Sequence, residues 1–270
     1  MPDWYSGHVV ANGIRIHYHR TGGEKPPLIL SHGITDNGLC WTRAAQALEN
    51  DFDLILADAR GHGLSDAPEE GYSHDARAAD LAGFITALDL RKPFLMGHSM
   101  GADTTAHTAA LYPELVGCAI LEDPPWYEDS VSSESRAATA NEWRTKLLER
   151  KSTTPKELVI AGREEHPIWA EIEFEPWVAA KLQVSLNVVQ VITDWRPDWR
   201  DIAAQIKSPT LVLIGDPARG SLVTPKVAAE ISGQYPHFTL AKIEGAGHSI
   251  RRDRFEQFID EVTTFLANLS

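Results

Sequence analysis

Cysteine is scarce in this sequence of 270 residues. The only two, Cys40 and Cys118, lie far apart in apolar surroundings. Such a pair argues against a disulfide framework or a cysteine-bound metal and suits two buried free thiols. The eleven histidines show no paired spacing typical of metal ligands. We therefore expect neither a metal ion nor another cofactor.

Positive charge is also in short supply. Lys and Arg number 25 against 38 Asp and Glu, which gives a formal net charge of −13. Nucleic acid and anionic membrane surfaces bind clustered Lys and Arg, and this chain lacks such clusters. Long apolar runs are missing too, and residues 1–20 mix charged and apolar side chains unlike a secretory signal. We expect a cytoplasmic monomer or homodimer that acts on a small molecule.

What the sequence does contain is a regular alternation of short apolar runs and helical patterns. With 43% hydrophobic residues the chain can form a packed core. Continuously apolar strands separated by helices predict an α/β protein with a mostly parallel sheet covered on both faces. The eight expected strands cover residues 7–10, 14–19, 27–30, 53–57, 93–96, 118–121, 210–214 and 238–241. The expected helices of this part cover residues 40–49, 75–88, 100–111, 225–232 and 252–267.

Residues 124–200 interrupt this alternation. They show helical patterns at 134–150, 155–163 and 176–191 and no strand pattern. Six of the eight tryptophans fall in this segment. We therefore expect a core domain made of residues 1–123 and 201–270, with residues 124–200 inserted after the sixth strand as a helical cap.

The most informative motif is Gly97-His98-Ser99-Met100-Gly101, between an expected strand and an expected helix. This G-x-S-x-G pattern is meaningful in that setting, because a sharp strand-to-helix turn presents the serine at the carboxyl edge of the sheet. Glycines flank the serine because the turn leaves no room for larger side chains. We predict that Ser99 is a catalytic nucleophile.

A serine nucleophile needs a base and two N–H donors for the oxyanion. His248 follows the last expected strand, so its loop reaches the same edge of the sheet, and we predict that it is the base. The loop Ser31–Ile34 also follows a strand. The backbone N–H groups of Ile34 and Met100 are the expected oxyanion donors.

With these residues in place, the chain resembles the α/β-hydrolase superfamily. The likeness rests on His32-Gly33, Asp58–Asp66, Gly97–Gly101, Gly215-Asp216 and Gly247-His248, in the family's order and spacing. It implies the α/β-hydrolase fold, an eight-stranded sheet with a cap. The Asp58–Asp66 loop looks like a turn of capped esterases, lactonases and C–C bond hydrolases, and we expect its role to be structural.

The acid of the triad departs from the family's common pattern. In relatives it usually follows the strand at 210–214, but the two positions reached by counting are Ala218 and Ser221, which carry no carboxylate. Asp216 is the only carboxylate of that loop. Some superfamily members place the acid about twenty-four residues after the nucleophile, which here is Asp123. We predict Asp123, with Asp216 and then Glu122 as alternatives.

The resemblance implies hydrolysis through an acyl-enzyme, and the serine argues against dehalogenase or epoxide hydrolase chemistry. The tryptophan-rich cap predicts a medium-sized apolar or aromatic substrate, with Trp126 in the binding pocket. A carboxylesterase or lactonase is the expected enzyme. Cleavage of an amide or C–C bond, and a small-molecule receptor that does no catalysis, are the alternatives.

Overall fold

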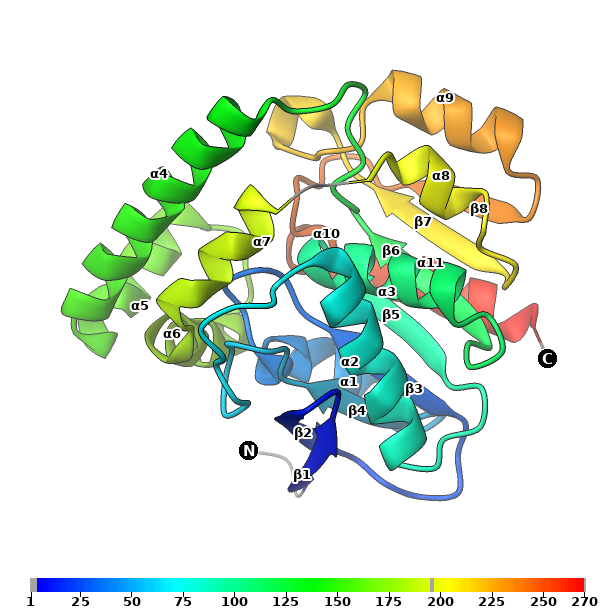
Figure 1. Cartoon of the computed structure of the whole chain (residues 1–270), viewed down its shortest axis with the longest axis horizontal. Coiled ribbons are helices and arrows are strands. Elements are labelled where there is room, and N and C mark those ends of the chain that lie inside the picture. Colours follow the sequence, from blue (N-terminus) through cyan, green and yellow to red (C-terminus); the bar gives the residue numbers. More distant parts are fainter. Residues whose placement is uncertain (1–3, 195–196, 270) are drawn as a thin grey trace.

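The computed structural model describes residues 4–194 and 197–269. Its centre is an eight-stranded sheet with the order β1-β2-β4-β3-β5-β6-β7-β8 (Figure 1). β1 and β2 form an antiparallel hairpin, β2 pairs antiparallel with β4, and every other pairing is parallel. The predicted fold class is thereby confirmed. The strands are β1 (Tyr5–Ala11), β2 (Ile14–Arg20), β3 (Pro27–Ser31), β4 (Asp53–Ala57), β5 (Phe94–His98), β6 (Cys118–Glu122), β7 (Thr210–Ile214) and β8 (Phe238–Lys242).

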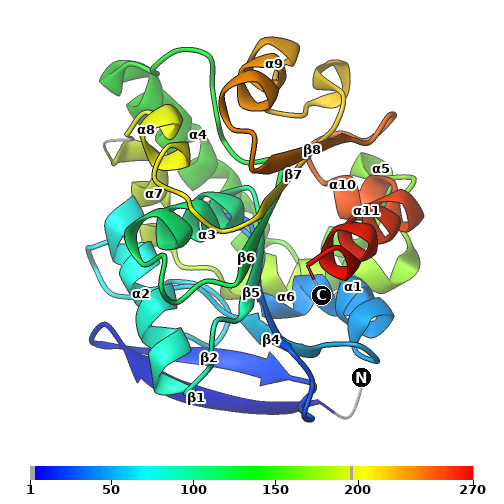
Figure 2. The ribbon, with the colours of Figure 1, turned by 90° about the vertical axis from the view of Figure 1, so that its right-hand side faces the viewer.

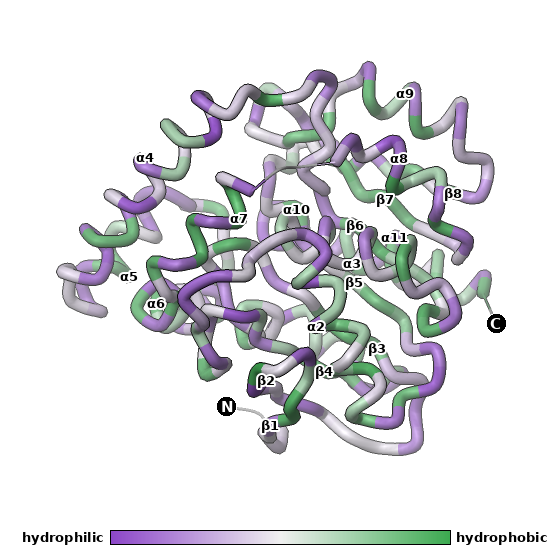
Figure 3. Tube along the Cα trace, viewed as in Figure 1, coloured by the Kyte–Doolittle hydropathy of each residue, from purple (hydrophilic) through white to green (hydrophobic). Residues whose placement is uncertain are grey.

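Helices cover both faces of the sheet, as Figure 2 shows. Side chains on adjacent strand positions point to opposite faces, so Ile29 and Leu95 belong to one apolar core and Leu30 and Met96 to the other. The central strands are correspondingly hydrophobic along their length (Figure 3). The first core is closed by α2 (His74–Ala87), α3 (Met100–Leu111), α8 (Trp199–Ala203) and α9 (Pro225–Gln234), and the second by α1 (Thr42–Leu48) and α11 (Phe255–Ala267).

The segment after β6 folds mainly into helices that gather beside the sheet (Figure 1). None of its described residues forms a strand. Its α-helices are α4 (Ser133–Ser152), α5 (Pro155–Glu165), α6 (Phe174–Gln183) and α7 (Gln190–Thr193), and its short 3-10 helices are η2 (Glu171–Glu173) and η3 (Leu186–Val189). The predicted boundary at residue 200 falls inside α8, and Trp195 lies outside the described residues. Among those residues no helix is long and apolar enough to cross a membrane.

Two predicted helices are divided in the structure. The helix expected at 176–191 breaks after Gln183, because Val184 is extended with ψ 134° and the Ser185 N–H donates to the carbonyl of Gly61 at 2.7 Å. The helix expected at 252–267 is split at Arg254 into α10 (Ile250–Asp253) and α11. In both places a contact or turn outside the helix overrides the helical pattern.

The turn between β5 and α3 depends on glycine. A Cβ atom on Gly101 would lie 2.0 Å from the carbonyl oxygen of Ser31, and one on Gly97 would lie 2.2 Å from the carbonyl oxygen of Gly101. Both contacts are with backbone, which cannot rotate away as a flexible side chain can. These two glycines therefore let β3, β5 and α3 approach closely at the carboxyl edge of the sheet.

We predict that Gly101→Ala lowers the free energy of unfolding by about 3 kcal/mol or more, because the added methyl group overpacks a backbone contact. The matched variant is Gly233→Ala in α9, where a Cβ atom would meet nothing within 4 Å. That variant should be more stable by about 0.5–1 kcal/mol, since alanine is the better helix former. Urea unfolding of the three proteins measures both effects. Equal stability of Gly101→Ala and the original protein would contradict this account of the turn.

Candidate active site

Ser99 stands at the sharp turn between β5 and α3. Its backbone has φ 53° and ψ −115°, a conformation that residues other than glycine rarely adopt. The strain is imposed by the strand before it and the helix after it, and such strain is common where a reactive side chain must be presented. Ser99 is partly exposed and lines a cavity of about 540 Å³. This is the location predicted for a nucleophile.

His248 reaches the same cavity from the loop between β8 and α10. Its Nδ1 lies 2.6 Å from Oδ2 of Asp123, and about a third of its side chain is exposed. A carboxylate on Nδ1 fixes the ring's orientation and leaves Nε2 free to accept a proton. The structure thus joins the predicted base to the preferred candidate for the acid.

Asp123 is completely buried directly after β6 and has a positive φ of 42°. Its carboxylate accepts hydrogen bonds from Ser221 Oγ at 2.7 Å, Leu222 N at 2.9 Å and Val223 N at 3.3 Å, in addition to the contact with His248. Ser221 is one of the two positions at which relatives usually carry the acid. The loop after β7 therefore supports Asp123 by donating to it.

The two alternative acids lie in other surroundings. Asp216 accepts from Lys242 Nζ at 2.9 Å and from the N–H of Gly245, and the nearby ammonium lowers the pKa of Asp216. Glu122 is buried and accepts from both the backbone N–H and the guanidinium of Arg251, each at 2.9 Å. Burial raises the pKa of Glu122. Among the described residues neither carboxylate forms a hydrogen bond or ion pair with His248, so the structure brings His248 together with Asp123.

The predicted oxyanion donors, Ile34 and Met100, both line the cavity of Ser99. The loop that carries Ile34 passes close to the nucleophile, because a Cβ atom on Gly33 would lie 2.9 Å from His98 Nδ1 and 3.7 Å from Ser99 Cβ. Met100 is the first residue of α3, where backbone N–H groups lack partners within the helix and carry the positive end of its dipole. This end of the cavity suits a developing negative charge.

His98 is a supporting residue that the sequence analysis did not single out. It is buried, its Nε2 lies 2.9 Å from the carbonyl oxygen of His248, and the two rings are 4.7 Å apart. Burial and the nearby Arg251 hold the pKa of His98 well below its usual range. A neutral His98 donates from Nε2 to that carbonyl and thereby fixes the loop of His248. No sequence pattern distinguished it from an ordinary residue of the motif.

A buried charge network adjoins the cavity and was also missed. Asp36 is paired with Lys181 at 2.9 Å, Arg252 at 3.1 Å and Arg251 at 3.3 Å. Burial alone would raise the pKa of Asp36, but these three cations hold it well below its usual range. Glu173 takes a further contact with Arg252 at 3.1 Å. The network joins α6 and η2 to the loops that carry Ile34 and His248.

The Asp58–Asp66 loop is held in place by its own charged residues. The Asp58 carboxylate accepts from Gly38 N at 2.7 Å and Leu64 N at 2.9 Å. Arg60 is paired with Asp80 through two hydrogen bonds of 2.5 Å each. These contacts support the structural role expected for the loop.

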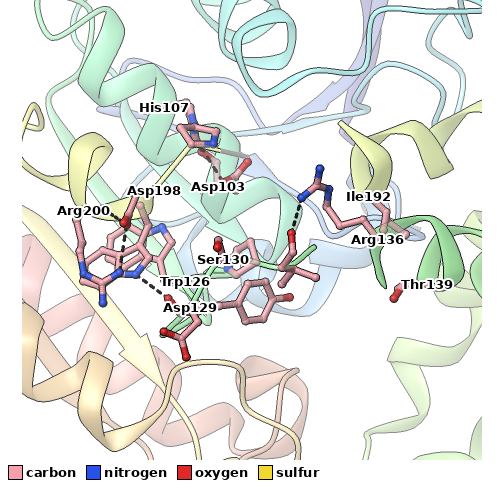
Figure 4. Close-up of a pocket in the computed structure, with 15 residues that line it drawn as sticks. Asp103, His107, Trp126, Asp129, Ser130, Arg136, Thr139, Ile192, Asp198 and Arg200 are labelled. Carbon is pink, nitrogen blue, oxygen red and sulfur yellow. Dashed lines mark hydrogen bonds and ion pairs between the residues drawn. The ribbon is translucent and has the colours of Figure 1, made fainter. Parts of the chain in front are cut away.

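Trp126 lies outside the cavity of Ser99. It is buried, stacks on Trp199 with ring centroids 4.9 Å apart, and lines a neighbouring cavity of about 430 Å³ (Figure 4). Pro125 and Tyr127, on either side of it, line both cavities. The aromatic residues around Ser99 are instead Tyr127, Trp143, Trp169 and Trp177. Stacking of Trp126, in the segment after β6, on Trp199 of α8 accounts for its position.

One group within the described chain has the composition of a metal site, His74, Asp103 and His107. Its centre is already taken by a cation, because Arg77 Nη2 lies 2.8 Å from Asp103 Oδ2 and 3.1 Å from His74 Nδ1. A metal ion there would face a guanidinium at short range and lose its attraction to the carboxylate. The group fits a buried ion pair better than a metal centre.

Comparisons with known proteins show the family to which the chain belongs. The family model of the alpha/beta hydrolase fold matches residues 26–251. The chain is 31% identical over 276 residues to N-formylmaleamate deformylase from Pseudomonas putida, and the alignment covers 96% of each protein. It is 28% identical over 261 residues to 2-(acetamidomethylene)succinate hydrolase from Mesorhizobium japonicum, which covers 92% of this chain and 90% of the relative.

A solved structure shows the same fold. The N-formylmaleamic acid deformylase of Pseudomonas putida S16 superposes with a TM-score of 0.78 at 28% identity, over 96% of this chain and 100% of that one. By name, the first of these two relatives is a deformylase and the second a hydrolase. The chain belongs to the alpha/beta hydrolase fold family.

Proposed function

We propose that the protein is a serine hydrolase that cleaves a carboxylic acyl bond through a Ser99–His248–Asp123 triad. The observation that carries this proposal is the 2.6 Å contact between His248 and Asp123 at a cavity that Ser99 also lines. A strained serine, an oriented imidazole and a buried carboxylate are the three parts that nucleophilic acyl transfer requires. The N–H groups of Ile34 and Met100 complete the proposal as the oxyanion hole.

The chemistry follows from these positions. Ser99 Oγ attacks the carbonyl carbon while its proton passes to His248 Nε2, and the carbonyl oxygen takes the negative charge near the N–H groups of Ile34 and Met100. The tetrahedral intermediate then expels the leaving group, which takes the proton from His248. A water molecule, deprotonated by His248, attacks the acyl-enzyme, and Ser99 leaves with its proton restored.

We propose residues 124–200 as the cap over this site. Support comes from the cavity wall, since Trp143 of α4, Trp169 before η2 and Trp177 of α6 line the same cavity as Ser99. The loops of the core thus supply the reacting groups, and the helical segment supplies the opposite wall. This second wall limits the contact of the site with bulk water and so strengthens electrostatic interactions there.

The bond that we propose is an amide of a small carboxylate, in place of the ester or lactone of an apolar compound expected from the sequence. The names of the two full-length relatives indicate substrates that carry an N-acyl group and carboxylate character. The cavity wall also carries four cationic side chains, Arg77, Arg150, Lys181 and Arg252. Three of them are paired with buried carboxylates of the protein, but Arg150 is near only the exposed Glu165, so it is the cation that an anionic substrate can use. That the protein acts on a small molecule, is located in the cytoplasm and forms a monomer or homodimer are still predictions.

We predict that a fluorophosphonate reagent labels Ser99 and that Ser99→Ala abolishes both labelling and hydrolysis of 4-nitrophenyl acetate. An activated ester reports acyl transfer even when the natural bond is an amide, because both react through an acyl-enzyme. Mass spectrometry of the labelled peptide identifies the serine. Tight binding of carboxylates without turnover or labelling would instead support a receptor.

We also predict that Asp123→Asn lowers kcat by about 10⁴-fold, since an amide at this position favours the wrong tautomer of the base. The matched variant Asp216→Asn removes the same charge from a neighbouring loop and should change kcat less than threefold, by our estimate from its separate ion pair. Circular dichroism checks that both variants fold. The opposite order of the two losses would assign the acid to Asp216.

A further inference from the structure

The cavity of Ser99 is lined by four cations, and three of them are buried and paired with carboxylates of the protein. Lys181 donates to Asp36 and to both oxygens of Thr35. Arg252 is paired with Asp36 and Glu173, each at 3.1 Å. A buried cation with such partners has its charge compensated and its hydrogen bonds largely filled.

The third of these cations is Arg77. It donates to Asp103 Oδ2 at 2.8 Å, Thr104 Oγ1 at 2.6 Å and the carbonyl of Met100 at 3.1 Å. These contacts tie α2 to the first turns of α3. Arg77 therefore supports the helix behind the nucleophile, and Asp103 already compensates its charge.

Arg150 differs from the other three. Its side chain is 25% exposed, and the one carboxylate near it belongs to Glu165, at 3.6 Å and itself 53% exposed. No side-chain hydrogen bond of Arg150 is found among the described residues. Its guanidinium lies 5.4 Å from the ring centroid of Trp177, which supports one face of the cation. An arginine held in this way keeps the donors on its edge available.

The orientation of α4 explains why Arg150 faces the cavity. Thr139, Trp143 and Arg150 are spaced by four and seven residues and therefore lie on one face of the helix, and all three line the cavity. Arg144 follows Trp143 directly, is exposed, and does not line the cavity. The same helix thus carries one cation toward the site and another toward solvent.

We propose that Arg150 binds a carboxylate of the substrate, at the part of the cavity formed by the cap, and so determines specificity for anionic acyl compounds. This inference rests on the proposed function for the site of acyl transfer. The planar guanidinium matches a carboxylate through two parallel hydrogen bonds. Glu165 is exposed enough to turn toward solvent when the carboxylate of the substrate takes its place.

The test compares two esters of equal length in the complete protein. One is mono-4-nitrophenyl adipate, which carries a free carboxylate, and the other is 4-nitrophenyl hexanoate, which carries a methyl group instead. We expect Arg150→Gln to raise KM for the adipate ester by about 10- to 100-fold, the range for loss of a charged hydrogen bond, with kcat nearly unchanged. The hexanoate ester has no carboxylate for Arg150 to bind, so its KM should rise far less than that of the adipate ester.

The matched control is Arg144→Gln, which removes the same charge from the same helix outside the cavity. It should leave KM for both esters within about twofold, because an exposed charge at this distance is screened. Arg150→Lys keeps the charge without the planar donors, so it should show an intermediate KM for the adipate ester. This variant also serves if Arg150→Gln does not fold.

A binding measurement separates this inference from the proposed function. Calorimetry with adipate requires no turnover, and Arg150→Gln should weaken adipate binding by the same factor as it raises KM. If neither ester is hydrolysed but adipate binding depends on Arg150, the acyl-transfer proposal fails and the carboxylate site stands. Equal effects of Arg150→Gln on both esters, or unchanged adipate binding, would overturn the assignment of Arg150.

Discussion

The buried carboxylate of Asp36 connects the parts of the molecule that meet at the cavity. It lies two residues after Ile34 and is paired with Lys181 of α6 and with Arg251 and Arg252 of α10. Removing one member of a buried charge network leaves unpaired charge behind, at a cost of about 3–5 kcal/mol. The relative positions of the loop of Ile34, the loop of His248 and α6 therefore depend on one carboxylate.

Two backbone positions next to this network carry strain, and both belong to the proposed triad. Ser99 and Asp123 have positive φ angles at the ends of the neighbouring strands β5 and β6. The rest of the fold sustains these conformations, through the close packing around Gly97 and Gly101 and the four donors to the Asp123 carboxylate. Strain of about 1–3 kcal/mol per residue persists only where surrounding contacts outweigh it.

The sequence predicted the features that depend on local patterns. Strand periodicity and the turn around Ser99 are local, so the sheet and its carboxyl edge could be inferred residue by residue. The contact between His248 and Asp123 was reached only as one of three alternatives, because it joins residues 125 positions apart. The partners of Asp36 could not be inferred at all. A buried ion pair has no sequence pattern of its own, and Lys181 and Arg252 look like ordinary surface residues in a helical pattern.

The tryptophans of residues 124–200 pack against charge as well as against apolar side chains. Their number predicts an apolar pocket, and three cations also lie over the rings of this cavity. Arg252 is 4.6 Å from the ring centroid of Trp169, and Lys181 and Arg150 are 5.0 Å and 5.4 Å from that of Trp177. The face of an aromatic ring attracts a cation, and the side of the cation that points away from the ring can keep its water or bind a ligand. An aromatic wall is therefore a suitable support for positive charge, and the tryptophans that predict an apolar substrate are compatible with the anionic one that we propose.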